Sequence, residues 1–273
     1  MRINNNVMAA NAYRNVSNTN NTLGKSLEKL SSGFRINRAA DDAAGLTRSE
    51  GLRSEINGAK QAIRNAQDGV SFVQTAEGAM NEVHAVLQRM RTLAVSAANS
   101  TSDGAAEQAE VDELLSELDA IGTRTTFNRS AVFQDYSGTA AALNFHIGAG
   151  SADTLSVSAD LGLASDSVFG STGLDSLSLT SGAAAAIETI DDAISAVSTA
   201  RSTLGATQNR LEHTIANVSV SVENLSAAES RIRDADIAEE MVTFTRNQIL
   251  QQAGTAMLAQ ANSVPQSVLS LLR

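Results

Sequence analysis

The sequence contains no cysteine, no tryptophan and a single proline, Pro265, and aromatic residues make up 3% of its 273 positions. Without cysteine there is no disulfide framework and no thiol catalysis. With so few aromatic rings, a compact core anchored by them is disfavoured. Because proline hardly ever interrupts the apolar patterns, we expect a mainly helical fold that packs through Ala, Leu, Ile and Val side chains.

Basic charge is also scarce. The 20 Lys and Arg residues are outnumbered by 30 Asp and Glu, which gives a formal net charge of -10 and a pI of about 4.8. A surface that binds nucleic acid or an anionic membrane needs basic residues, so both functions are disfavoured. Residues 1–20 contain no apolar core or cleavage site of a Sec signal peptide, and no run of about 18 apolar residues occurs, so we expect no membrane insertion.

The longest regular pattern runs from Ile187 to Ile232. Apolar residues recur there every three and four positions, as in a coiled coil, which predicts one helix of about 70 Å. Its apolar side must be covered by a second long helix or by other copies of the chain. Three polar residues, Arg201, Gln208 and Glu229, interrupt the stripe. Either they form buried polar layers that fix register or permit sliding, or they reach a solvent edge.

Two further helices are expected upstream. An apolar stripe over residues 52–93 predicts a second long helix, and a shorter stripe over 111–121 predicts a third. The segment NSTSDG at 99–104 has the composition of a turn, so the second and third helices should form a helical hairpin.

Residues 137–182 differ in character from the rest. Glycine, serine and threonine increase there, and charge decreases. Alternating apolar residues at 143–147 and 155–157 predict a small β-hairpin. The remainder of this region is expected to form surface loops.

Both chain ends carry apolar stripes diluted by Asn, Gln, Ser and Thr, which are weak helix formers or add no apolar area. A lone pair of such ends buries too little apolar area to offset about 1–2 kcal/mol of backbone entropy per residue. We therefore expect residues 1–40 and 235–273 to order only on assembly. The expected polymerisation and coiled-coil interface consists of Leu23, Leu27, Leu30, Phe34, Ile237, Met241, Phe244, Val264, Val268 and Leu271.

Catalytic and ligand-binding patterns are missing. His84, His146 and His213 are far apart in sequence and belong to no metal or triad motif, and no glycine-rich phosphate loop is present. Asp41 and Asp42 precede AAGL, where carboxylates cap a helix more often than they catalyse. We expect no enzyme activity, no cofactor and no metal.

Two long stretches closely resemble the ends of bacterial flagellin. They are LEKLSSGFRINRAADDAAGL at 27–46 and the segment from ENLSAAESRIRDADIAEE to the terminal SVLSLLR at 223–273. INNNVMAANAYRN, which begins at Ile3, is a third similar stretch. The chain resembles a short flagellin without large outer domains.

The resemblance implies a fold of long antiparallel helices in a coiled-coil bundle with a small β-hairpin, divided into discontinuous inner and outer domains. The two chain ends would pair as an inner coiled coil. The implied domains are an inner helix and connector at 1–44, outer helices at 45–136, the β-hairpin and loops at 137–182, the long outer helix at 183–230, and an inner helix at 231–273.

The resemblance also implies a function and partners. The chain would be secreted through the flagellar type III export channel and polymerise into the extracellular flagellar filament for swimming motility. An export chaperone, a filament cap and hook-junction proteins would be its partners. The alternative is a hook–filament junction protein, which has similar ends. Arg89, Leu93 and Glu110 match positions by which some flagellins engage a host Toll-like receptor, although Met90 to Thr92 depart from that pattern.

Overall fold

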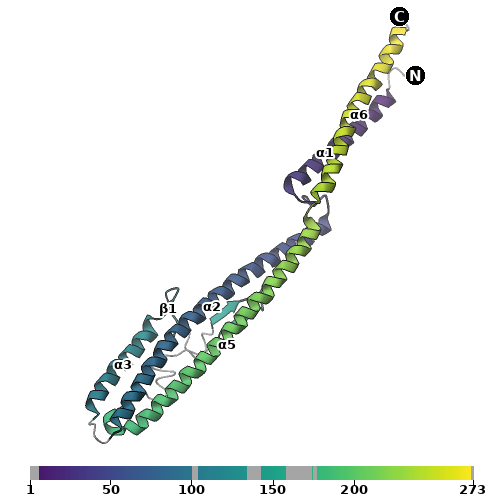
Figure 1. The fold of residues 1–273 in the computed structure, drawn as a ribbon. Coiled ribbons are helices and arrows are strands. Elements are labelled where there is room, and N and C mark those ends of the chain that lie inside the picture. The colour runs from purple at the N-terminus through teal and green to yellow at the C-terminus, as the bar shows by residue number, and fades with distance from the viewer. Residues whose placement is uncertain (1–5, 100–103, 134–142, 158–173, 175–176, 272–273) are drawn as a thin grey trace. The chain divides into compact units, whose positions relative to one another are not determined.

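The computed structural model describes residues 6–99, 104–133, 143–157, 174 and 177–271. Within them the predicted mainly helical fold is confirmed. Figure 1 shows the long helices. The four short strands in the described residues form two antiparallel pairs. The elements are α1 (Val7–Ser32), α2 (Ala43–Ala97), α3 (Ala105–Arg124), β1 (Thr126–Phe127), β2 (Ser130–Ala131), β3 (Leu143–His146), β4 (Thr154–Val157), α5 (Leu179–Arg233) and α6 (Ile237–Leu271).

The chain divides into two compact units. One combines both chain ends, Met1–Glu55 and Glu223–Arg273, and the other is the continuous segment Ile56–Val222. No described helix has the length and apolar character that a membrane span requires.

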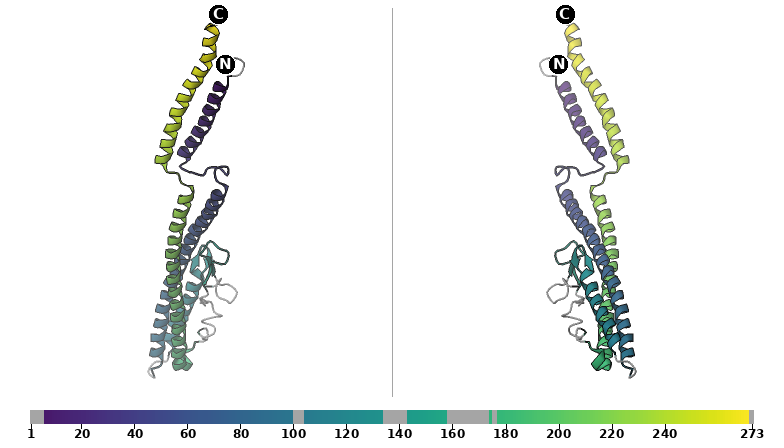
Figure 2. Two further views of the ribbon diagram at one scale, coloured as in Figure 1. Left: turned by 90° about the vertical axis from the view of Figure 1, so that its right-hand side faces the viewer. Right: turned by 90° about the vertical axis from the view of Figure 1, so that its left-hand side faces the viewer.

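The unit formed by 56–222 contains the main hydrophobic core. Parts of α2 and α5 lie side by side with α3 (Figure 1, Figure 2), and the apolar positions of their stripes face one another. The largest fully buried side chains are Phe72, Phe133, Met80, Leu87, Met90, Leu174, Ile190, Leu204, Leu211 and Val73. The coiled-coil packing expected of the long stripes is therefore present in this unit.

Ion pairs on the rim of the core show in which directions the helices run. Arg91 on α2 binds Asp191 on α5, with 2.5 Å between Nε and Oδ1. A residue earlier on α2, Glu77, lies 3.9 Å from a later residue on α5, Arg201. The two helices therefore run antiparallel, and their similar length lets them pair side by side.

Two of the three polar interruptions of the long stripe, Gln208 and Arg201, do not form buried layers. Gln208 is half-buried, and its amide donates a hydrogen bond of 2.9 Å to Glu212, one turn further along the same helix. Arg201 is also half-buried and extends towards Glu77. Both side chains reach the solvent edge, which is the second of the two alternatives for this stripe.

The β-hairpin expected near 143–157 is confirmed, with Phe145 opposite Leu155 in the β3–β4 register. A second, two-residue hairpin, β1–β2, was not predicted. Its turn residues Asn128 and Arg129 have φ angles of 51° and 67°, as a tight hairpin turn requires. Aromatic rings from both hairpins pack against the ring of Phe72 on α2. Most of the surface loop expected over the rest of 137–182 lies outside the described residues. Its described part was predicted wrongly, because Leu174 and Leu177 are buried in the core and α5 already begins at Leu179.

Local signals in the sequence set the limits of the first two helices. Gly33 follows α1 in the left-handed conformation, with φ of 75°, and its N–H donates to the Lys29 carbonyl. Asp42 precedes α2, and its carboxylate accepts a hydrogen bond of 2.9 Å from the Gly45 N–H. The expected cap chemistry of Asp42 is confirmed.

Candidate assembly surface

The helices at the two chain ends, α1 and α6, lie side by side and antiparallel (Figure 2). The Asn6 side chain donates a hydrogen bond of 2.8 Å to the Ala261 carbonyl. Further along, a Cβ atom added to Gly254 would lie 2.7 Å from Cγ2 of Val16. The two helices therefore approach as closely as a glycine permits.

This helix pair encloses very little apolar side chain. In the described part of the end unit, the buried hydrophobic residues are Ile36 and Ala261. By contrast, ten of the twelve exposed large hydrophobic residues in the described parts of the chain lie on α1 and α6. We call these ten residues the end-helix surface: Val7, Met8, Tyr13, Leu27, Ile237, Met241, Val242, Ile249, Leu250 and Met257.

The end-helix surface includes a groove and a flank. The groove runs between α1 and α6, and its apolar walls are Met8, Ala12, Val16, Leu250, Ala253 and Met257. The flank follows α6 alone, past Met241, Val242, Ile249 and Leu250. Met241 and Val242 lie about 100° apart around the helix, so together with Ile249 and Leu250 they widen the apolar face of α6 beyond a single heptad stripe.

The predicted interface residues lie in different environments. Leu27, Ile237 and Met241 are exposed, whereas Leu23, Leu30, Phe34, Phe244 and Val264 are half-buried. Val268 and Leu271 belong to α6, but their side chains lie outside the described structure. Residues such as Ile249 and Leu250 were missed because they lie off the heptad stripe. The adjacent apolar pairs on α6 were the signal that would have found them.

The connectors that follow α1 and precede α6 are paired with each other. Phe34 and Asp234 form an isolated antiparallel bridge. The backbone N–H of Arg35 donates a hydrogen bond of 2.7 Å to the Arg233 carbonyl. The pairing holds the two ends of the chain in a fixed register with each other.

Arg233 ties these connectors to the start of α2. Its guanidinium carbon lies 4.9 Å from the centroid of the Phe34 ring, within cation–π range. It also donates a hydrogen bond of 2.6 Å to Glu50 and one of 3.3 Å to the buried Ser49 hydroxyl. The hydrogen bond from Arg233 lowers the pKa of the Glu50 carboxyl below its ordinary value.

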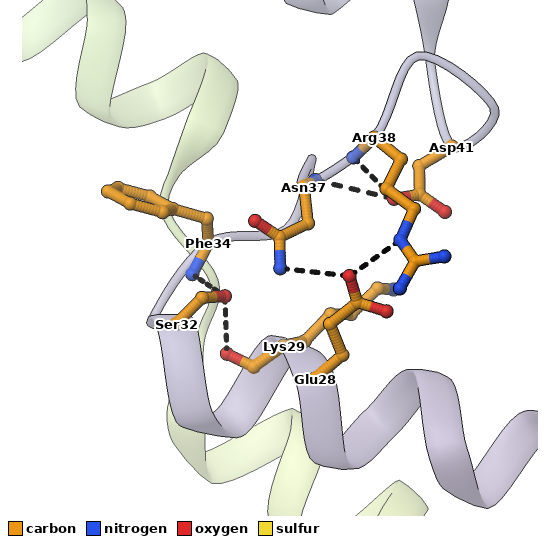
Figure 3. A network of polar contacts seen from close by, with 7 residues as sticks. All are labelled: Glu28, Lys29, Ser32, Phe34, Asn37, Arg38 and Asp41. Atoms are coloured by element: carbon orange, nitrogen blue, oxygen red, sulfur yellow. Dashed lines mark hydrogen bonds and ion pairs between the residues drawn. The ribbon is translucent and has the colours of Figure 1, made fainter.

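The first connector is also folded back onto α1 (Figure 3). Glu28 accepts hydrogen bonds from the Asn37 amide at 3.3 Å and the Arg38 guanidinium at 2.8 Å. Asp41 accepts the backbone N–H groups of Asn37 and Arg38, and the bond from Arg38 is the main reason its pKa is lowered. The connector therefore has a defined path, although its composition shows no apolar periodicity.

The candidate receptor residues lie on α2 and α3. Arg89 and Glu110 are brought together, with 2.6 Å between guanidinium and carboxylate, and both are exposed. Leu93 is 8% exposed and belongs to the hydrophobic core. The structure thus brings the two charged residues to one surface and places the leucine beneath it.

The three histidines, which the sequence places in no metal or catalytic motif, can also be located. His84 is half-buried and pairs with Gln88 through Nε2, and His146 and His213 are exposed on β3 and α5. Among the described residues, no three His, Asp or Glu side chains gather in a way that could hold a metal ion.

A helical protein whose end helices pair without a core and leave an apolar surface uncovered has the properties of a self-assembling structural subunit. Residues 3–138 match the bacterial flagellin N-terminal helical region, and residues 187–272 match the bacterial flagellin C-terminal helical region.

Relatives of full length give the same assignment. The chain is 48% identical to a flagellin of Halalkalibacterium halodurans and 46% identical to a flagellin of Bacillus subtilis, and each alignment covers 100% of both chains. It is also 46% identical to the flagellar filament 33 kDa core protein of Treponema phagedenis, again over 100% of both. The chain belongs to the bacterial flagellin family. It is a structural subunit of the extracellular flagellar filament and not an enzyme, and these matches do not favour the junction-protein alternative.

Proposed function

We propose that the end-helix surface is the polymerisation interface of this filament subunit, together with the half-buried Leu23, Leu30, Phe34, Phe244 and Val264 and with Val268 and Leu271. The observation that carries the proposal is the concentration of ten exposed large hydrophobic residues on α1 and α6. Covering one such side chain contributes about 1.5–3 kcal/mol. The groove between α1 and α6 and the flank of α6 adjoin at Leu250 and extend along both end helices, so more than one neighbouring copy covers them in this proposal.

We propose that the end helices become ordered only in the filament. Residues 1–40 and 235–273 order when neighbouring copies bury the end-helix surface, because the pair alone buries little beyond Ile36 and Ala261. In this proposal the inner domain comprises 1–44 and 231–273, and the outer domain comprises 45–136, 137–182 and 183–230.

A matched pair of substitutions tests the interface. Ile249→Asp places a charge on the end-helix surface, where Ile249 is 61% exposed. Val220→Asp is the control, since Val220 is a similarly exposed apolar residue on α5. Ile249→Asp should raise the critical concentration for seeded filament growth by about tenfold or more, and Val220→Asp by much less. Equal effects of the two substitutions would contradict the proposed interface.

We propose that the same surface binds the flagellar export chaperone before assembly and contacts the filament cap during insertion. The first subunits of the filament would contact hook-junction proteins in the same way. The apolar flank of α6 supports the chaperone proposal, because an unassembled subunit exposes Met241, Val242, Ile249 and Leu250. Ile249→Asp should weaken binding of the subunit to the chaperone. An unchanged affinity for the chaperone would show that chaperone binding and polymerisation use different residues.

Recognition by a host Toll-like receptor is proposed for the surface around Arg89 and Glu110, with Leu93 supporting it from the core. The exposed ion pair supports this, since each side chain reaches solvent. Arg89→Ala should reduce receptor signalling by purified subunits while their thermal unfolding stays close to that of the parent. Unchanged signalling would remove Arg89 from the proposed contact.

A further inference from the structure

The five methionines in the described part of the chain fall into two groups by exposure. Met80 and Met90 are 2% and 0% exposed in the core of α2. Met8, Met241 and Met257 are 69%, 47% and 65% exposed and lie on the end-helix surface. Met8 and Met257 line the same groove between α1 and α6.

Among the described residues, these exposed sulfur atoms are the most readily oxidised side chains. The sequence has no cysteine and no tryptophan to react first. Methionine reacts with peroxides according to exposure, and the product, methionine sulfoxide, is reversible by dedicated reductases. Buried Met80 and Met90 are shielded from the reagent in the folded core.

We propose that Met8, Met241 and Met257 are oxidation-sensitive modification sites that control whether a free subunit joins the filament. The proposal rests on the proposed polymerisation interface. The oxidant is a peroxide: the methionine sulfur attacks one peroxide oxygen, the O–O bond breaks and a sulfur–oxygen bond forms. The thioether loses two electrons to become a sulfoxide, and hydrogen peroxide is reduced to water.

A sulfoxide opposes assembly because it places a strongly polar oxygen where the interface buries apolar surface. Each thioether is a flexible apolar group that fits an irregular contact, and oxidation removes that property. An uncompensated polar atom at one of these positions should raise the critical concentration by about tenfold or more. Subunits already in the filament are protected, since neighbouring copies cover the same residues.

The first test uses the unaltered full-length protein. Subunits are treated with hydrogen peroxide until about half carry one sulfoxide, and limited growth is started with filament seeds. Pelleted filament and remaining supernatant are then compared by peptide mass spectrometry. Sulfoxide at Met8, Met241 and Met257 should be several-fold higher in the supernatant than in the pellet. Equal sulfoxide content at these three positions in both fractions would overturn the proposal.

Two further measurements separate this inference from the polymerisation interface itself. In preformed filaments the same three residues should oxidise at least about tenfold more slowly than in free subunits. Equal rates would contradict the covered interface and thus the proposed function. The combined variant Met8→Leu, Met241→Leu and Met257→Leu conserves volume and should keep growing after peroxide treatment. If peroxide stops its growth as in the parent, oxidation acts elsewhere and the inference is wrong, whatever the interface.

Discussion

The closest approach of α1 and α6 offers a sharp test of the end-helix pairing. Gly254→Ala adds a Cβ atom 2.7 Å from Cγ2 of Val16, whereas carbon atoms in contact prefer about 3.5–4.0 Å. Val16 has little freedom to move aside, because a β-branched side chain in a helix occupies mainly one rotamer. The helices must therefore separate locally, which by analogy with overpacked cores costs about 1–3 kcal/mol.

Glycine replacement also has a favourable effect that must be subtracted. Alanine is about 0.8–1.0 kcal/mol better than glycine inside a helix. Gly24→Ala on α1 measures this gain alone, since a Cβ atom at Gly24 would have no neighbour within 4 Å. The difference between the two variants isolates the steric cost, and about 1–3 kcal/mol corresponds to a roughly 5- to 150-fold higher critical concentration for Gly254→Ala.

The assay is seeded filament growth, with the unpolymerised subunit concentration measured at steady state. Val16→Ala combined with Gly254→Ala should restore growth, because removing Cγ2 makes room for the new Cβ, and the double-mutant cycle should give a clear coupling. If Gly254→Ala grows as well as Gly24→Ala, α1 and α6 do not meet at this position in the filament and the pairing is wrong.

Three other outcomes are expected. Limited proteolysis of free subunits should trim both ends and leave a core near 45–230 that no longer polymerises; ends that resist the protease would argue against ordering on assembly. Gln208→Leu should change the free energy of unfolding of this core by less than about 0.5 kcal/mol in thermal melts, because Gln208 already reaches solvent beside Glu212, and a marked stabilisation would restore the buried-layer alternative. The hydrogen bond from Arg91 lowers the pKa of Asp191 below 3.8, so its contribution is complete above that pH and is lost as pH falls through the lowered pKa. Denaturant unfolding should show Asp191→Asn less stable than the parent at neutral pH and nearly equal to it near pH 2; a constant difference would contradict this.

Periodicity predicted the helices well because their packing follows directly from it. The stripe over 187–232 lies within α5, and the stripes over 52–93 and 111–121 lie within α2 and α3. In these helices the positions that repeat every three and four residues are the ones that bury against a neighbour. The stop at Gly33 and the cap at Asp42 were equally readable, because each depends on a few adjacent residues.

Features that depend on distant residues could not be read in this way. The β1–β2 hairpin contains an arginine with positive φ at position 129, which no turn preference would select. The link from Arg233 to Phe34 and Glu50 joins residues nearly 200 positions apart, and nothing near Arg233 indicates its partners. Heptad reasoning also assumes a single buried face, so it missed the second apolar direction of α6 at Ile249 and Leu250.

The antiparallel pairing of α2 with α5 has a consequence for the order in which the chain folds. Arg91 and Asp191 are 100 positions apart, and Asn6 and Ala261 are 255 apart. Contacts of such separation close only after the intervening chain is available, and closing them late slows folding. While the chain is synthesised from its N-terminus, α2 and α3 can pair as a local hairpin, but the main core cannot close until α5 follows. The topology therefore delays the collapse of this core until the final third of the chain is available.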